Sequence, residues 1–201
     1  MFIITIKKLN FKVFIILFSL SLKMELDSLD DFIICRIFNF LSQKDMVRLT
    51  AVSKRWLKLR DDIHHIITSM NMTDEQLLLY KNVNSLDCVS NQILTNESIK
   101  RLPLTKLICQ HNNNFTDEGI KYLPLTHLDC GGCQFTDEVI KQLPLKELIC
   151  SENIVLTDEG IKNLSLTRLD CGLNQNFTTE GIKNSSLIYL NIRANFIIYE
   201  H

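Results

Sequence analysis

Residues 83–196 repeat one pattern of hydrophobic and polar positions at a nearly fixed spacing. Four clear copies occupy residues 104–123, 125–143, 145–164 and 166–183, with a looser copy at 83–102 and a truncated one that begins at Leu187. Cysteines recur at steps of 21, 21, 20 and 21 residues, at Cys88, Cys109, Cys130, Cys150 and Cys171. A period of this length indicates a solenoid, in which neighbouring units bury a shared core.

Each unit predicts one short strand followed by one short helix. The segment L-x-x-L-x-C is apolar at alternate positions, so it fits a strand with one buried face. Thr-Asp-Glu then begins a helix, because threonine is a good N-cap and acids suit the first turn. Pro124 and Pro144 prevent the helix from continuing. We therefore predict one strand and one short helix per 20–21 residues.

Between strand and helix, each unit has a polar turn residue and then an apolar one. The turn residue can hydrogen-bond the backbone as the chain leaves the strand, and the apolar residue closes the turn onto the core. The turn positions are Asn91, Asn112, Cys133, Asn153, Asn174 and Asn195, and the closing residues are Leu94, Phe115, Phe135, Leu156 and Phe177.

The motif L-x-x-L-x-C-x-x-N/C-x-x-[LF] resembles the leucine-rich repeat, in the cysteine-containing variety found in F-box proteins. The resemblance covers about residues 83–196, more than half of the chain. It implies an α/β solenoid whose strands line an inner, concave face.

Side chains that flank the buried leucine and cysteine form three rows across this inner face, and these residues can differ between units. We predict that the face binds a target protein, with Ile108 and Ile149 exposed among charged residues. The alternative is a solvated face whose strands tolerate two β-branched residues. The candidate target-binding residues are Lys106, Ile108, Gln110, His127, Asp129, Glu147, Ile149, Arg168, Asp170, Tyr189 and Arg193.

A second pattern lies before the repeats, where apolar residues recur at helical spacing from Phe32 to Leu41. Ser42-Gln43-Lys44-Asp45 interrupts it, and a second helix is predicted from Met46 onwards. Periodicity alone indicates only a small unit of two or three helices. The order of residues from Leu26 to Leu59 is similar to an F-box, with leucine and acids, then I-x-x-x-I/F-x-x-L, S-x-x-D, and a final R-W.

The F-box resemblance implies docking on an SKP-family linker and, through it, on a cullin scaffold. Asp30 stands where the family usually has proline, and this departure is expected to weaken docking. The alternative is that the helices only cover the first edge of the solenoid. The residues that would contact the linker are Leu29, Ile33, Ile37, Leu41, Leu49, Val52 and Trp56.

These patterns divide the chain into a hydrophobic leader at 1–23, F-box-like helices at 24–60, a linker with a capping half-repeat at 61–82, and repeats at 83–201. The leader has three interpretations: an extension ahead of a natural start at Met24, a membrane anchor, or a cleaved signal. Its uninterrupted apolar run from Val13 to Leu22 is shorter than the roughly 20 residues that span a bilayer.

Composition limits the classes of partner and the cellular compartment that we expect for this chain. A net charge of −1 gives no overall field that would favour nucleic acid or an anionic membrane. Five of the seven cysteines occupy the buried strand position, where they act as small apolar residues. Stacked thiols favour a reducing compartment, so we expect a cytoplasmic or nuclear protein unless residues 1–22 are an anchor.

The sequence offers one motif with redox or metal spacing, Cys130-Gly131-Gly132-Cys133. Both cysteines fall on repeat positions, and no second C-x-x-C accompanies them, so we interpret them as packing residues. The five histidines have no metal-ligand spacing, and the Asp-Glu pairs sit at helix starts. We predict no enzymatic activity, no cofactor and no metal.

The expected function is that of a substrate adaptor in an SCF-type cullin–RING ubiquitin ligase. The linker would hold the F-box, and the repeat face would hold an unknown target protein while other subunits transfer ubiquitin. Two alternatives stay open: a leucine-rich-repeat interaction protein with no ligase link, and a membrane-anchored or secreted repeat protein.

Overall fold

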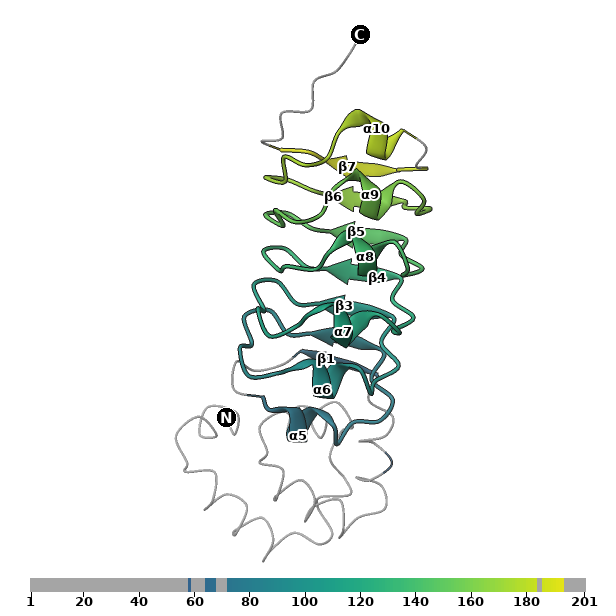
Figure 1. The fold of residues 1–201 in the computed structure, drawn as a ribbon. Helices are drawn as coiled ribbons and strands as arrows, with labels where there is room; N and C mark the ends of the chain where they lie inside the picture. Colours follow the sequence, from purple (N-terminus) through teal and green to yellow (C-terminus); the bar gives the residue numbers. More distant parts are fainter. Residues whose placement is uncertain (1–57, 59–63, 68–71, 184–185, 194–201) are drawn as a thin grey trace, which may run out of the picture.

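A computed structural model describes residues 58, 64–67, 72–183 and 186–193 (Figure 1). The predicted leader, the predicted linker-binding residues and Asn195 lie outside this part of the chain. Within it, no helix has the length and apolar character that crossing a membrane requires.

Seven parallel strands form one sheet in strict sequence order, and a short helix follows each of the first six (Figure 1). The predicted alternation of one strand and one helix per unit is therefore confirmed. The strands are β1 (His65–Ile67), β2 (Ser85–Asp87), β3 (Lys106–Ile108), β4 (His127–Asp129), β5 (Glu147–Ile149), β6 (Arg168–Asp170) and β7 (Tyr189–Asn191). The helices are α5 (Asp74–Leu77), α6 (Asn96–Ile99), α7 (Asp117–Ile120), α8 (Asp137–Ile140), α9 (Asp158–Ile161) and α10 (Thr179–Ile182).

Neighbouring strands pair without any shift in register. Leu86, Leu107, Leu128, Leu148 and Leu169 stand opposite one another along the sheet. The backbone N–H of each ladder cysteine continues the pairing by donating to the next strand, as Cys109 does to the Asp129 carbonyl at 2.8 Å. Equivalent residues of successive units therefore form straight rows across the sheet.

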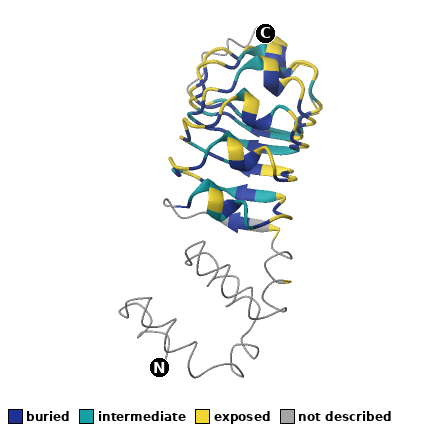
Figure 2. Ribbon diagram, turned by 60° about the horizontal axis from the view of Figure 1, so that its bottom comes forward, coloured by how far each residue is buried: buried dark blue, intermediate teal, exposed yellow. Residues whose placement is uncertain are grey.

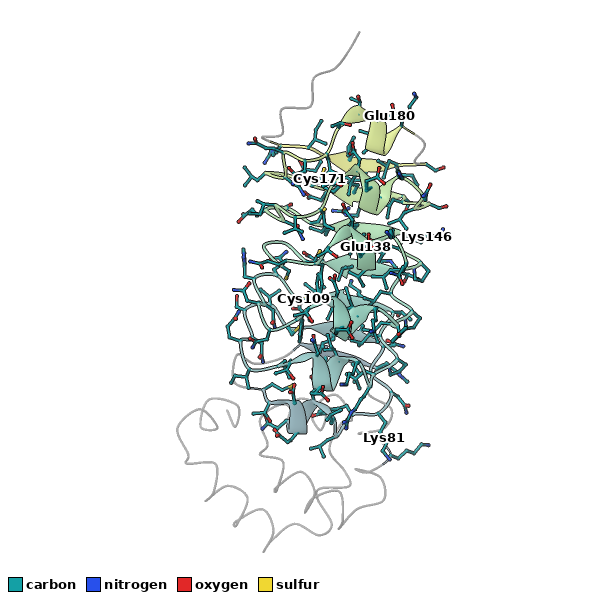
Figure 3. All side chains as sticks on the ribbon, viewed as in Figure 1. Lys81, Cys109, Glu138, Lys146, Cys171 and Glu180 are labelled. Carbon is teal, nitrogen blue, oxygen red and sulfur yellow. The ribbon has the colours of Figure 1, made fainter. Side chains whose placement is uncertain are left out.

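The core lies between the sheet and the column of helices, where Figure 2 shows the buried residues. The strand leucines and ladder cysteines point inward, and the leucine or phenylalanine that closes each turn joins them. Figure 3 shows Cys109 and Cys171 at equivalent places along the stack. Burial of apolar surface between successive units is therefore what holds the stack together.

Buried asparagines hold the turns after β2, β3, β5 and β6. The Asn112 amide donates to the Asn91 carbonyl of the previous unit, and its oxygen accepts from the Asn114 N–H at 2.9 Å. The Asn153 oxygen likewise accepts from Val155 and Leu156. The predicted turn role is confirmed at Asn91, Asn112, Asn153 and Asn174, all of which are fully buried.

Threonine is the N-cap of every described helix from α5 to α10, as predicted. The first helical residue has a further role that the sequence did not indicate. The Asp137 carboxylate accepts from the backbone N–H of Thr157 at 2.9 Å and from its hydroxyl at 2.6 Å. The same pair of bonds links Asp74 to Thr95, Asp117 to Thr136, and Asp158 to Thr178. These aspartates therefore join one unit to the next.

The third helical position explains the glycines of three units. A Cβ atom placed on Gly160 would lie 2.4 Å from an Asp137 carboxylate oxygen, and one on Gly181 would lie 2.1 Å from Asp158. Glycine here leaves room for the carboxylate of the previous unit. It is not required for the bonds to threonine, because Ser98 in α6 and Val139 in α8 hold the same position where Asp74 and Asp117 make those bonds.

Candidate functional site: the exposed strand face

The face of the sheet turned away from the helices carries the three predicted rows of side chains. The register places Lys106, His127, Glu147, Arg168 and Tyr189 in the first row, one on each successive strand. It places Ile108, Asp129, Ile149, Asp170 and Asn191 in the second. The predicted residues are therefore brought together on one continuous surface.

First-row side chains interact with one another across strands. The His127 imidazole lies 3.4 Å from the Glu147 carboxylate, and the Arg168 guanidinium stacks over the Tyr189 ring at 4.0 Å from its centre. A polar contact between half-exposed side chains contributes little stability, whereas a cation over an aromatic face can form a small pre-shaped contact. The repeat spacing predicts which residues are neighbours in this row, but not that these side chains turn toward one another.

The second row alternates acidic and apolar residues. Asp129 accepts a hydrogen bond from the Gln110 amide at 2.8 Å, and Asp170 accepts from Ser151 at 2.8 Å and from Asn191 at 3.1 Å. Partial burial raises the pKa of Asp129, and the negative charges of Asp170 and Asp87 add to this effect, whereas the hydrogen bonds oppose it. The groups that donate hydrogen bonds to these carboxylates are therefore neutral, and among the described residues the negative charges are not paired with cations.

The prediction that Ile108 and Ile149 are exposed is wrong in degree, because both are half-buried. Their neighbours in the second row stand on strands roughly 4.8 Å away and cover part of each side chain. The two isoleucines still offer apolar surface between the aspartates.

The third row is discontinuous. Gln110 and Arg193 bring side chains to it, but Gly131 and Gly172 occupy the equivalent places on intervening strands and are buried. The surface available to a partner is therefore made mainly by the first two rows.

The Cys130–Cys133 motif lies in the core and not at a reactive surface, since both side chains are at most 1% exposed. The Cys133 thiol donates to the Cys109 carbonyl at 3.1 Å, which takes the place of the asparagine amide bond of other units. Burial raises the pKa of Cys88, Cys130 and Cys150, and the hydrogen bond with Cys133 followed by burial raises that of Cys109. The hydrogen bond with the Cys109 side chain lowers the pKa of Cys133, but this side chain is buried. The four thiols whose pKa is raised stay neutral and are poor nucleophiles and metal ligands.

No group of three His, Cys, Asp or Glu side chains able to hold a metal ion occurs in the described part of the chain. A shallow hollow between α6 and α7 is lined by Lys100, Arg101 and Tyr122 among others, and it lies on the helix side, away from the strand face. The prediction that the chain has no enzymatic activity stays a prediction.

The comparisons with known proteins concern the segment ahead of this array. Residues 26–59 match the F-box domain family. No curated protein matches the chain. The F-box domain contains all seven residues that we predict to contact a linker, namely Leu29, Ile33, Ile37, Leu41, Leu49, Val52 and Trp56. These seven lie outside the described residues, so their contacts stay predictions.

Proposed function

We propose that this chain is a substrate-recognition adaptor of an SCF-type cullin–RING ubiquitin ligase. The observation that carries the proposal is the F-box domain at residues 26–59, because F-box proteins are typically adaptors that bind an SKP-family linker. The parallel strand–helix stack that follows supports the second half of the role, since it gives a continuous side-chain surface suited to a protein target.

In this proposal the array is a leucine-rich-repeat domain at 83–201, joined through a linker and capping half-repeat at 61–82 to the F-box helices at 24–60. The motif spacing, the parallel pairing and the buried asparagine turns support that assignment. Residues 1–23 lie outside both of these parts.

Catalysis would come from proximity. The F-box holds the chain on the linker and cullin, and the strand face holds the target, so the effective concentration of target lysines near the ubiquitin-loaded enzyme rises. The chain itself then needs no nucleophile, metal or cofactor. The target-binding residues would be those of the first two rows, together with Gln110 and Arg193.

The deciding experiment is co-purification of the chain with an SKP-family linker, with Leu41→Asp as the disrupting variant. Ile154→Asp is the matched control, because Ile154 is 77% exposed in a turn of the array and the change in chemistry is nearly the same. We expect wild type and Ile154→Asp to retain the linker and Leu41→Asp to lose it without loss of secondary structure. A folded wild-type chain that fails to bind would overturn the ligase role.

The Asp30→Pro variant tests whether the acid at this position weakens binding to the linker. If the missing proline weakens docking, Asp30→Pro binds the linker more tightly than wild type. Equal affinity would mean that the acid at this position is tolerated at the partner surface.

The runner-up function is a repeat-based interaction protein with no ligase link, in which the N-terminal helices only cover the end of the array. It is favoured if a folded chain binds a target through the strand face but no linker.

A further inference from the structure

The second row has a regular alternation of aspartate and isoleucine, which the repeat spacing predicts and the register of the strands confirms. Asp87, Ile108, Asp129, Ile149 and Asp170 stand opposite one another on five consecutive strands. Parallel strands lie roughly 4.8 Å apart, so an aspartate recurs about every 9.6 Å along a line across the sheet. An isoleucine fills each gap.

The three carboxylates are positioned by the protein but not neutralised by it. Asp129 and Asp170 accept from the side chains of Gln110, Ser151 and Asn191, and the Asp87 carboxylate accepts from the Val89 N–H at 3.3 Å. No ion pair within the described residues involves any of these aspartates. The row therefore offers fixed negative charge to a partner.

The cations of the face lie mostly at the other ends of the strands. Lys106 and Arg168 are in the first row, and Arg168 is engaged with the Tyr189 ring. Arg193 lies past the end of β7. The face as a whole is close to neutral, but its charge is sorted by row, so complementarity favours a partner that aligns along the second row.

The spacing of this row selects a partner conformation. A polyproline II helix rises about 3.1 Å per residue with three residues per turn, so every third side chain lies on one side at a spacing of about 9.3 Å. That distance agrees with the spacing of the aspartates. A β-strand places neighbouring side chains of one face roughly 6.8 Å apart, which does not agree. The aliphatic stems of the cationic side chains would pack on Ile108 and Ile149.

We propose that the second row binds an extended, proline-rich segment of the target in the polyproline II conformation, with lysine or arginine at every third residue. This assignment rests on the adaptor role, since it names the target class of the same surface. The basic residues would pair with Asp87, Asp129 and Asp170, and their aliphatic stems would contact the two isoleucines.

The test is fluorescence anisotropy with labelled twelve-residue peptides and the full chain. The probe is four repeats of Lys-Pro-Pro, and the comparison peptide has the same composition with all four lysines in one block. A third peptide carries glutamate in place of lysine. We expect the regularly spaced basic peptide to bind more tightly than either of the others, and its affinity to fall with added salt.

Variants locate the site. Each of Asp87→Asn, Asp129→Asn and Asp170→Asn is expected to weaken binding about two- to fivefold, and the triple variant more than tenfold, as expected for partly exposed ion pairs. The matched control is the triple variant Glu97→Gln, Glu138→Gln and Glu159→Gln, which makes the same change in net charge on the exposed helix side. This control should bind like wild type. Circular dichroism checks that each variant is folded, and the single variants decide the matter if the triple one is not.

Three outcomes would overturn the assignment: equal affinity for the spaced and blocked peptides, preference for the acidic peptide, or equal weakening by the helix-side control. Linker co-purification is measured on the same protein and does not involve this face. Loss of peptide selectivity with an intact linker interaction would therefore refute the target class alone, and the reverse result would refute the ligase role alone.

Discussion

Residues that alternate along a single strand differ in how much they vary from one unit to the next. The side chains that point into the core are almost the same in every unit, leucine and then cysteine, and both are fully buried in β5 and its extension at Leu148 and Cys150. The side chains that point outward change from unit to unit in charge, size and shape, as Glu147 and Ile149 do relative to their neighbours.

The difference shows how one scaffold serves two requirements. Inward positions must fit the same space in every layer, because each unit packs on a copy of itself. Outward positions contact mainly their row neighbours and solvent, so they are free to form a surface for a partner. Neighbouring residues on opposite sides of the strand should therefore respond very differently to substitution.

The largest difference is expected between Leu148→Ala and Ile149→Ala. Leu148 is fully buried, so its truncation leaves a cavity and lowers the free energy of unfolding by about 3 kcal/mol. Ile149 is half-buried on the open face, and its truncation should lower it by about 1 kcal/mol or less. Urea denaturation followed by circular dichroism measures both, and similar losses would contradict the division between the two sides.

The turn after β3 gives the next contrast. Asn112→Ala removes the buried amide bond to the Asn91 carbonyl and the acceptor for the Asn114 N–H. We expect a loss of about 2 kcal/mol in the free energy of unfolding. Asn113→Ala, at the exposed adjacent position, should leave the denaturation midpoint within error of wild type.

A smaller effect is expected in the helix column. Asp137→Ala removes both hydrogen bonds to Thr157 and should lower the free energy of unfolding by about 1 kcal/mol. Glu138→Ala removes only an exposed ion pair with Lys141 and should change little. If both variants unfold at the same urea concentration, the aspartate does not join the two units as described.

The smallest effect is expected at Asp129, and it depends on pH. Because burial raises the pKa of this carboxyl in the folded state, the stability linked to its protonation is present below the unfolded value near 3.8 and is lost as pH rises through the higher folded value. Asp129→Asn removes the charge, so it should be more stable than wild type at neutral pH. That advantage should shrink as pH falls, and denaturation series at pH 7 and near pH 4 would show it. A constant difference would contradict the raised pKa.

Much of this fold follows from the sequence because its determinants are local. The strand, the turn asparagine and the N-cap threonine each act within a few residues of their own unit, so the motif identifies them directly. The capping half-repeat within residues 61–82 was predicted for the same reason. In the structure Thr73 caps α5 and Ile66 is buried in β1.

Contacts between units could not be predicted in the same way. The Asp137–Thr157 bonds depend on the closeness of two helices, and a carboxylate at a helix start is explained equally well by the helix dipole. The pairing of Arg168 with Tyr189 and the half-burial of Ile149 likewise depend on the distance between strands. The residue type at a position shows which chemistry is available there. Which neighbouring side chain it contacts depends on how adjacent units pack.

The unshifted pairing of the strands has a consequence for how an array of this kind can change over time. A duplicated or deleted segment of one whole unit keeps every buried row in line, so the array can gain or lose a unit and retain the same core. On the outer surface, however, one inserted unit moves all later carboxylates by a single strand and breaks the alternation of acid and isoleucine. Two inserted units restore it. Such duplications would therefore be expected to survive selection in pairs wherever this surface is used.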